Sequence, residues 1–272
     1  MPVENVILRH WQDELRAFHQ NFSLLQEHLD PDPIHDLRVA IKKLRSYLKL
    51  YVALCHQEKV DEQFAKTRQL FSVLGKHRNI EITKTLLSSF TQKDNLDQRP
   101  VLLYLQLLHD QVLPFCKEAI EQYEMNELDA ITSQIRHDLE NAETDDLEAN
   151  IKKIIASSVG NIKEHLKHFR KKSHLIRKRF KDIFYWSKMF DEEVFFGKQE
   201  LKSLDKILDH LGNIQDHEVL IINLKNFRKT ILPGNIPQTK VIKEIEKSKA
   251  SKTKDALLEK AEKLTKDLVK QA

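Results

Sequence analysis

Apolar residues recur at spacings of three and four along most of the chain, which is the pattern of helices that bury one face. Pro31 and Pro33 are expected to end the first helix, because proline cannot continue the hydrogen bonding of a helix. Gly75, Gly160 and Gly212 are expected to bend or interrupt their helices. The pattern predicts an all-α fold with helices over the ranges 3–29, 34–53, 58–90, 101–112, 147–189, 198–210 and 214–229, an acidic helix that follows Pro114 toward Leu139, and a terminal helix after residue 237.

Composition agrees with a globular helical protein. The 272 residues include 5 Gly and 7 Pro, too few for a fold built from many tight turns, and the 40% of hydrophobic residues excludes a disordered chain. The two cysteines, Cys55 and Cys116, cannot form a disulfide framework. No apolar run approaches the ~20 residues of a membrane span, and the first residues lack an apolar signal core. We therefore expect a cytoplasmic protein with no membrane partner.

The net charge of +4 conceals a strong segregation of charge along the chain. Residues 118–148 contain eleven acids and one base, whereas residues 163–181 contain nine bases and one acid. Residues 35–49 contain five bases and one acid. Like charges at helical spacing repel each other, so a helix face with only a structural role normally mixes signs. The two basic segments are therefore candidates for binding an anion.

The chain also contains an internal repeat. Residues 74–81 (LGKHRNIE) resemble residues 211–218 (LGNIQDHE), and the basic positions upstream correspond at nearly the same offset. The corresponding pairs are His35 and His174, Arg38 and Arg177, Lys42 and Lys181, and Lys49 and Lys188. We expect one domain over residues 1–272 with repeats at approximately 1–140 and 141–272. The repeats are predicted to fold as two similar four-helix-type bundles related by a pseudo-two-fold.

Each repeat carries a stripe of basic residues on one helix face, with apolar residues such as Leu37 and Ile176 on the opposite face. The first stripe comprises His35, Arg38, Lys42, Arg45 and Lys49. The second comprises Lys167, Arg170, His174, Arg177, Lys181 and Lys188, with Lys171 and Lys178 at its edge. Such stripes suit a groove for a polyanion, because Arg and Lys bind phosphate oxygens. The alternative is that acids of residues 118–148 pack alongside the stripes and neutralise them. Within the stripes, neighbouring cations are expected to lower the pKa of the histidines.

The two stripes carry a motif of a known family. The sequence His35-x-x-Arg38-Val39-x-x-Lys42-Lys43-Leu44-Arg45 resembles the signature of the CHAD family, the conserved-histidine α-helical domain. His174-x-x-Arg177-Lys178-x-x-Lys181 resembles its second copy, and residues 74–79 and 211–216 resemble further blocks. The resemblance covers about residues 1–270. It implies two four-helix bundles whose basic helices line a central groove, binding of inorganic polyphosphate and association with polyphosphate granules.

The chain departs from the family pattern at several positions. Lys42 and Lys43 stand where the family usually has arginines, and Asn79 replaces the usual acid of the first LG block. Asp182 and Phe184 stand where the family commonly has further bases. The second stripe is therefore expected to bind less tightly in its C-terminal half, and the upstream bases Lys167, Arg170 and Lys171 are candidates to compensate.

Two other functions are alternatives to polyphosphate binding. A nucleic acid also binds Lys/Arg stripes, but the basic faces are expected to lack aromatic residues for base stacking. A metal-dependent phosphohydrolase would use the His-Asp pairs that begin at His35, His109 and His137, but adjacent residues of a helix diverge by 100°. No cysteine has a metal-ligand spacing and no glycine-rich phosphate loop exists.

The sequence therefore predicts a protein that binds inorganic polyphosphate, or a similar polyanion, without catalysis. No catalytic residue, metal ligand or cofactor is predicted. The predicted contact residues are His35, Arg38, Lys42, Lys43, Arg45, Lys49, Arg78, His174, Arg177, Lys178 and Lys181. Arg78 is included because the LG block is expected to turn the chain back toward the basic helix.

Overall fold

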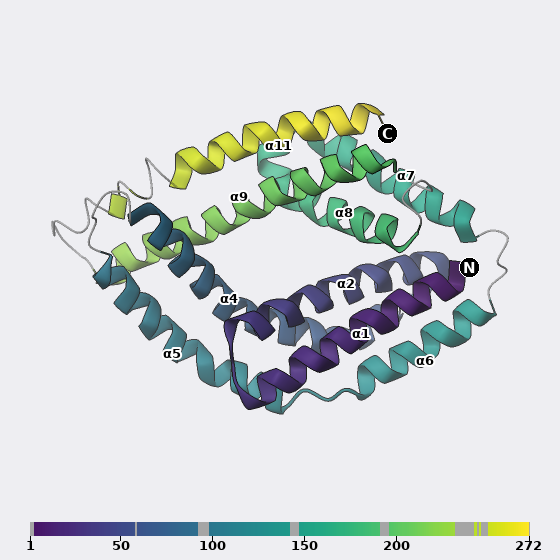
Figure 1. Cartoon of the computed structure of the whole chain (residues 1–272), viewed down its shortest axis with the longest axis horizontal. Coiled ribbons are helices and arrows are strands. Elements are labelled where there is room, and N and C mark those ends of the chain that lie inside the picture. Colours follow the sequence, from purple (N-terminus) through teal and green to yellow (C-terminus); the bar gives the residue numbers. More distant parts are fainter. Residues whose placement is uncertain are drawn as a thin grey trace.

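The computed structural model describes residues 3–57, 59–91, 98–141, 147–190, 196–231, 242, 243, 245 and 250–271. All regular structure in these residues is helical and none of them forms a strand, so the all-α prediction is confirmed. The helices are α1 (Val3–Glu27), α2 (Pro31–Cys55), α3 (Lys59–Gln63), α4 (Ala65–Thr91), α5 (Arg99–Glu121), α6 (Asn126–Glu140), α7 (Leu147–Leu166), α8 (Phe169–Met189), α9 (Lys198–Ile231) and α11 (Ser251–Gln271) (Figure 1).

The prolines at predicted helix ends have different effects on the helices. α1 ends before Pro31 as predicted, and Pro31 itself begins α2, because the first turn of a helix needs no backbone N–H donor there. Pro114 was expected to end a helix, but it lies inside α5 with its side chain exposed. Cys116 and Ile120 follow it and are buried in the core. Their burial offsets the hydrogen bond that proline removes.

The helix interruptions predicted at Gly160 and Gly212 are wrong. α4 runs through Gly75, α7 through Gly160 and α9 through Gly212 without a break. A glycine inside a helix costs only about 0.5–1 kcal/mol relative to alanine, and the apolar packing on either side outweighs that cost. The breaks lie at Phe64, between α3 and α4, and at residues 167–168, between α7 and α8. Phe64 is fully buried at its junction.

Four helices form a closed cycle of contacts at the centre of the molecule. α2 packs against α4 and α8, and α9 packs against the same two helices. α1 and α7 pack against α2 and α8, while α5 packs against α4 and α9, and α11 packs against α9 and α7. In Figure 1, α1, α2 and α6 lie in the lower half of the view and α8, α9 and α11 in the upper half, with α4 at the left between them. The cycle brings the predicted basic helices, α2 and α8, side by side.

Two apolar cores hold this cycle. The larger one contains the inner faces of α1, α2, α6, α7 and α8, and the smaller one joins the C-terminal halves of α4 and α9 to the start of α5. Specific hydrogen bonds fix the contacts between halves of the chain. Trp186 Nε1 of α8 donates to the carbonyl oxygen of Ser46 on α2 at 2.9 Å, and Asn223 Nδ2 of α9 donates to Thr83 Oγ1 of α4 at 2.6 Å. The apolar faces thus set the direction in which the polar faces point.

The helix pairs of the two predicted repeats correspond in order. The contact between α2 and α4 has its counterpart in that between α8 and α9, and α1 on α2 has its counterpart in α7 on α8. This correspondence agrees with the repeat found in the sequence. The pseudo-two-fold axis and the repeat limits near residue 140 remain predictions.

Candidate functional site

A cavity of about 540 Å³ lies among α2, α4, α8 and α9. Its lining residues are His35, Arg38, Lys42 and Arg45 of α2, Phe71, Arg78, Asn79 and Ile82 of α4, His174, Arg177, Lys178, Lys181, Asp182 and Tyr185 of α8, and Gln215, Asp216, Glu218 and Val219 of α9. A second hollow of about 330 Å³ between α8 and α9 shares Arg177, Lys181, Tyr185 and Asp216 with this cavity. The cavity wall is therefore strongly cationic.

The predicted contact residues converge on this cavity, with two exceptions. All of them except Lys43 and Lys49 line it. The Nζ of Lys43 lies 2.6 Å from Glu14 Oε1 of α1, and the Nζ of Lys49 lies 2.6 Å from Asp182 Oδ2 of α8. Both lysines thus have carboxylate partners in the protein. Arg78 also lines the cavity, but the turn predicted at the LG block is wrong, because that block is part of a continuous helix.

Arg38 is held against α4 by three contacts. Its guanidinium donates a hydrogen bond to the carbonyl oxygen of Phe71 and lies over the Phe71 ring, 3.9 Å from the ring centroid. The third contact is with Gly75, one turn further along α4. A Cβ atom at Gly75 would lie 2.8 Å from Arg38 Nη1, closer than van der Waals contact allows. Glycine at this position therefore makes room for the guanidinium.

Arg177 has an equivalent position in the second repeat. A Cβ atom at Gly212 of α9 would lie 3.3 Å from Arg177 Nη2, and Arg177 Nη1 donates to Gln215 Oε1 at 3.0 Å. The Nε of Arg177 is buried and has no hydrogen-bond partner among the described residues. The glycines of the repeated LG blocks thus have one shared role, to let an arginine of the neighbouring basic helix lie against the backbone.

Lys42 and Lys181 face one another across the α2–α8 contact, and no described carboxylate forms an ion pair with either. Burial, followed by the nearby charges of Arg38 and Arg177, lowers the pKa of Lys42 to about 8. Burial, together with Lys42 and Arg177, lowers the pKa of Lys181 to about 7. The cause is the same for both lysines, because removal from water and like charges nearby disfavour the charged form. At neutral pH these ammonium groups are close to losing their protons.

Other groups in the wall show the same electrostatic environment. Burial and the nearby Arg78 lower the pKa of Arg38 to about 10. Burial, followed by Arg78 and Lys42, lowers the pKa of His35, as the sequence predicts for a histidine among cations. Three acids also line the wall. Among the described residues, Asp216 is the one of these three that forms no ion pair with a lysine. Burial raises its pKa, while Arg177 and Arg78 oppose that rise.

The acidic segment does not neutralise the cavity. Residues 118–141 and 147–148, the described parts of that segment, contribute no lining residue. Its carboxylates Glu124 and Glu127 lie 3.4 and 3.3 Å from Lys66 Nζ of α4 instead. Of the acids in the wall, Asp182 pairs with Lys49 and Glu218 lies 3.6 Å from Lys254 Nζ of α11. The cations of the wall are therefore in excess.

The bases upstream of the second motif do not reach the cavity. Arg170 lies 3.4 Å from Asp255 and 3.5 Å from Glu259 of α11, so it is paired outside the wall. Lys167 and Lys171 are exposed and are not lining residues. They cannot compensate inside the cavity for the acid at position 182.

The sequence reasoning missed several residues of the wall. Tyr185 lies four residues after Lys181 and so on the same helix face, which the spacing alone predicts. Phe71 belongs to α4, and its place beneath Arg38 depends on a tertiary contact with no signal in the local sequence. The wall therefore includes two aromatic rings, and Tyr185 of α8 contradicts the expectation of no aromatic residue on the basic faces.

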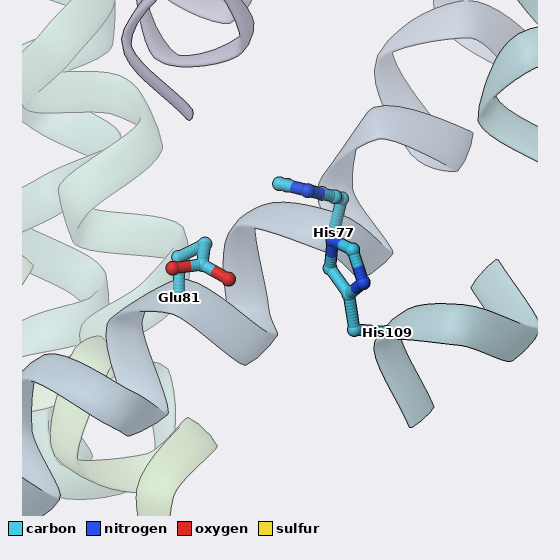
Figure 2. A group of neighbouring side chains, drawn as sticks. All are labelled: His77, Glu81 and His109. Carbon is cyan, nitrogen blue, oxygen red and sulfur yellow. The ribbon is translucent and has the colours of Figure 1, made fainter. Parts of the chain in front are cut away.

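The three His-Asp pairs do not form a common metal site. Among the described residues, the one group of His, Cys, Asp and Glu side chains spaced for a metal ion comprises His77, Glu81 and His109 (Figure 2). These residues belong to α4 and α5 and lie outside the cavity wall. His109 is thus the one histidine of the three pairs that belongs to such a group.

Comparison with known proteins gives three results. A family model described as the CHAD domain matches residues 9–225. The crystal structure of the CHAD domain from the plant Ricinus communis aligns with a TM-score of 0.69 and 15% sequence identity, over 94% of this chain and 92% of its own. PptA from Streptomyces chartreusis aligns with a TM-score of 0.68 and 11% identity, over 98% of this chain and 99% of its own. At these identities the two structures establish the fold alone. No curated protein matches the chain.

The lowered lysine pKa values predict a pH-dependent stability of the free protein. Lys42 and Lys181 lose their protons near pH 8 and 7 in the folded protein, against an ordinary value of 10.5 that applies to the unfolded chain. From about pH 7 to 9 the unfolded chain retains protons that the folded state has lost, so the free energy of unfolding rises with pH, on the order of 2 kcal/mol.

Urea denaturation at several pH values in this window measures the effect. The double variant Lys42→Met/Lys181→Met should show a flatter pH dependence, whereas Lys43→Met should keep the wild-type dependence. Equal slopes in the wild type and the double variant would show that these two lysines are not the source.

The glycine contacts predict an order of stability among alanine variants. A Cβ at Gly160 meets no atom within 4 Å, so Gly160→Ala should stabilise the protein by about 0.5–1 kcal/mol. Gly75→Ala has the same gain in helix propensity but displaces Arg38 from Phe71, and Gly212→Ala is intermediate. Thermal melts should therefore rank Gly160→Ala above Gly212→Ala and Gly75→Ala last. A Gly75→Ala variant as stable as Gly160→Ala would contradict the proposed role of Gly75.

Proposed function

Because the chain belongs to the CHAD domain family, we propose that it binds inorganic polyphosphate, or a similar polyanion, in the cavity among α2, α4, α8 and α9 and does not turn it over. The family is known for binding inorganic polyphosphate. The matched residues, 9–225, include every lining residue of the cavity. The chemistry of the wall supports the same ligand class from the residues upward.

One observation carries the proposal: Lys42 and Lys181 are half-buried in the cavity wall, and among the described residues neither forms an ion pair with a carboxylate. Removing a cation from water is costly unless a counter-charge and hydrogen-bond acceptors accompany it. Most of the groups near them are themselves cations, Arg38 and Arg177 among them, and Asp216 is the one described carboxylate that favours the charged form of Lys181. A chain of phosphates supplies both the counter-charge and the acceptor oxygens. Binding therefore relieves a cost that the fold itself leaves in place.

The two kinds of cation have different functions in this proposal. Arg38 and Arg177 are fixed by contacts with Phe71 and Gln215, so little conformational entropy is lost when they bind a ligand. A guanidinium presents a planar set of donors that matches phosphate oxygens, while a lysine is a compact charge on a flexible stem. The arginines thus set the position of a phosphate group, and the lysines adjust to its neighbours.

A nucleic acid is the alternative ligand, and the wall gives it some support. Tyr185 and Phe71 line the cavity, and aromatic rings stack on bases. One face of the Phe71 ring is already covered by Arg38 at 3.9 Å. Polyphosphate has no bases and needs no stacking surface, so the cationic wall alone accounts for its binding. We infer that polyphosphate is the ligand and treat single-stranded DNA as the competitor to be tested.

The charge of the cavity also supports binding without turnover. Metal-assisted phosphoryl transfer needs carboxylates or neutral histidines free to hold a divalent cation. Asp182 and Glu218 are engaged by Lys49 and Lys254, and the remaining acid, Asp216, is surrounded by cations that repel a metal ion. Such a wall binds an anion and leaves it intact.

The proposal extends to where the protein acts. No helix in the described ranges is long and apolar enough to cross a membrane. A protein that binds long polyphosphate chains would concentrate wherever those chains accumulate, so we infer association with polyphosphate granules in the cytoplasm.

Adjacent lysines of α2 provide a charge-matched test of the cavity. Lys42 lines the cavity without a carboxylate partner, and Lys43 pairs with Glu14 outside it. Lys42→Met should weaken binding of long-chain polyphosphate by about 1.5–3 kcal/mol, the range for hydrogen bonds to charged groups, and should make the salt dependence of affinity shallower. Lys43→Met removes the same charge and should leave affinity close to that of the wild type.

Binding isotherms over a salt series measure both variants against polyphosphate and against single-stranded DNA of matched charge. Equal losses in Lys42→Met and Lys43→Met would mean that overall charge, not this cavity, attracts the polymer. Equal affinities of the wild type for the two polymers would favour a general nucleic-acid binder.

The absence of turnover is tested directly. Incubation with polyphosphate, nucleotides or inorganic triphosphate in the presence of Mg²⁺ or Mn²⁺ should release no phosphate above the background of protein-free controls. The wall repels a divalent ion, and no group in it is predicted to activate water. Phosphate release that is lost in a His35→Ala or His174→Ala variant would overturn the proposal and favour a metal-dependent hydrolase.

A further inference from the structure

A compact group of metal-binding side chains lies between α4 and α5, outside the cationic cavity. His77 and Glu81 are one helical turn apart on α4, and His109 comes from α5 (Figure 2). One potential ligand atom from each residue lies within 4.8 Å of the other two. The two imidazole rings are close, with their centroids 5.0 Å apart and their planes inclined at 61°.

His77 has an unsatisfied polar atom at this position. Its side chain is 1% exposed, and its Nδ1 is buried with no hydrogen-bond partner among the described residues. A buried polar atom without a partner is uncommon and calls for a ligand, an ion or an ordered water. The imidazole cannot turn to bulk solvent for that partner, because the residue is enclosed between α4 and α5. A metal ion at this position would also engage the neighbouring His109 and Glu81, whose ligand atoms belong to the same group.

His109 is oriented by a carboxylate in the manner of a metal-binding histidine. Its Nδ1 lies 3.3 Å from Asp110 Oδ1, and Gln106 Nε2 donates to the same oxygen at 2.8 Å. A carboxylate that accepts the Nδ1 proton leaves Nε2 as the nitrogen with a free lone pair. Histidines that bind metals commonly have such a partner on their other nitrogen, which fixes the tautomer and the ring orientation.

We propose that His77, Glu81 and His109 bind a divalent transition metal ion, with Zn²⁺ as the ion that suits them best. Two imidazoles and one carboxylate form a ligand set used for zinc, with the fourth position open to water. Imidazole nitrogens disfavour Mg²⁺ and Ca²⁺, which prefer oxygen ligands. The ligand atoms of a tetrahedral zinc ion lie about 3.3–3.5 Å apart, so the side chains would close by about one ångström on binding. Glu81 would exchange its contact with Lys84, at 2.9 Å, for the ion.

The site would link α4 to α5, and it is the one candidate metal site among the described residues. An ion held by both α4 and α5 would resist separation of this pair and stabilise the folded protein by mass action. Arg78 and Asn79, next to His77 on α4, line the cavity on another face of the helix. The ion would thus fix the segment of α4 that carries part of the cavity wall, although its binding does not depend on the proposed polyphosphate function.

Zinc titration of the untagged full chain tests the proposal. Isothermal titration with Zn²⁺ alone, in a buffer without phosphate or chelator, should show one site per chain in the wild type, and Zn²⁺ should raise the melting temperature. Glu81→Gln and His109→Ala should each weaken this site by at least about tenfold and abolish the rise in melting temperature. His137→Ala is the matched control, because it removes an exposed histidine from another His-Asp pair on α6 and should leave the zinc site intact.

Two results would overturn the proposal. One is a wild type that binds no stoichiometric Zn²⁺, and the other is zinc affinity that is unchanged in both Glu81→Gln and His109→Ala. If His109→Ala fails to fold, Glu81→Gln decides, since glutamine preserves the size of a side chain that is 22% exposed. Polyphosphate binding of metal-free Glu81→Gln should equal that of the metal-free wild type. This last measurement separates failure of the zinc site from failure of the proposed function.

Discussion

Repulsion among the half-buried cations of the central cavity is the constraint that the rest of the structure has to satisfy. Arg38 and Lys42 of α2 and Arg177 and Lys181 of α8 lie in one wall without enough acids to balance them. Their helices stay together because the opposite faces are buried in the large apolar core, and because Trp186 ties α8 to α2. The stability supplied by that core offsets the cost at the cavity. The fold thus concentrates its least favourable electrostatics where a bound anion would remove them.

The helical class and the two basic faces could be predicted from the sequence, because a rotation of 100° per residue fixes which side chains share a face of one helix. The same rule could not say what lies opposite that face. Lys43 follows Lys42 directly and yet faces α1, where Glu14 binds it. Lys49 shares the stripe of Lys42 but lies far enough along α2 to meet Asp182 of α8. The carboxylate partners of both lysines come from other helices, which periodicity within one helix does not register.

The glycines show a second limit of sequence reasoning. Gly75 and Gly212 recur in the two LG blocks, and the low helix propensity of glycine predicted a bend at Gly75 and a break at Gly212. The structure assigns them a different role, since a missing Cβ allows Arg38 and Arg177 to lie against α4 and α9. The group around His77 shows the same limit. Helical spacing places His77 and Glu81 on one face of α4, but it cannot predict their partner His109 on α5. Close approaches between distant segments leave little trace in local sequence, so they account for most of what was missed.

The closed cycle of contacts among α2, α4, α9 and α8 has a consequence for unfolding. If a polyanion occupies the cavity that these helices line, it contacts helices from both halves of the chain at once. Each contact of the cycle would then have to open against the bound ligand as well as against its own apolar packing. A ligand held by all four helices would therefore hold the cycle closed and couple the unfolding of one half of the chain to that of the other.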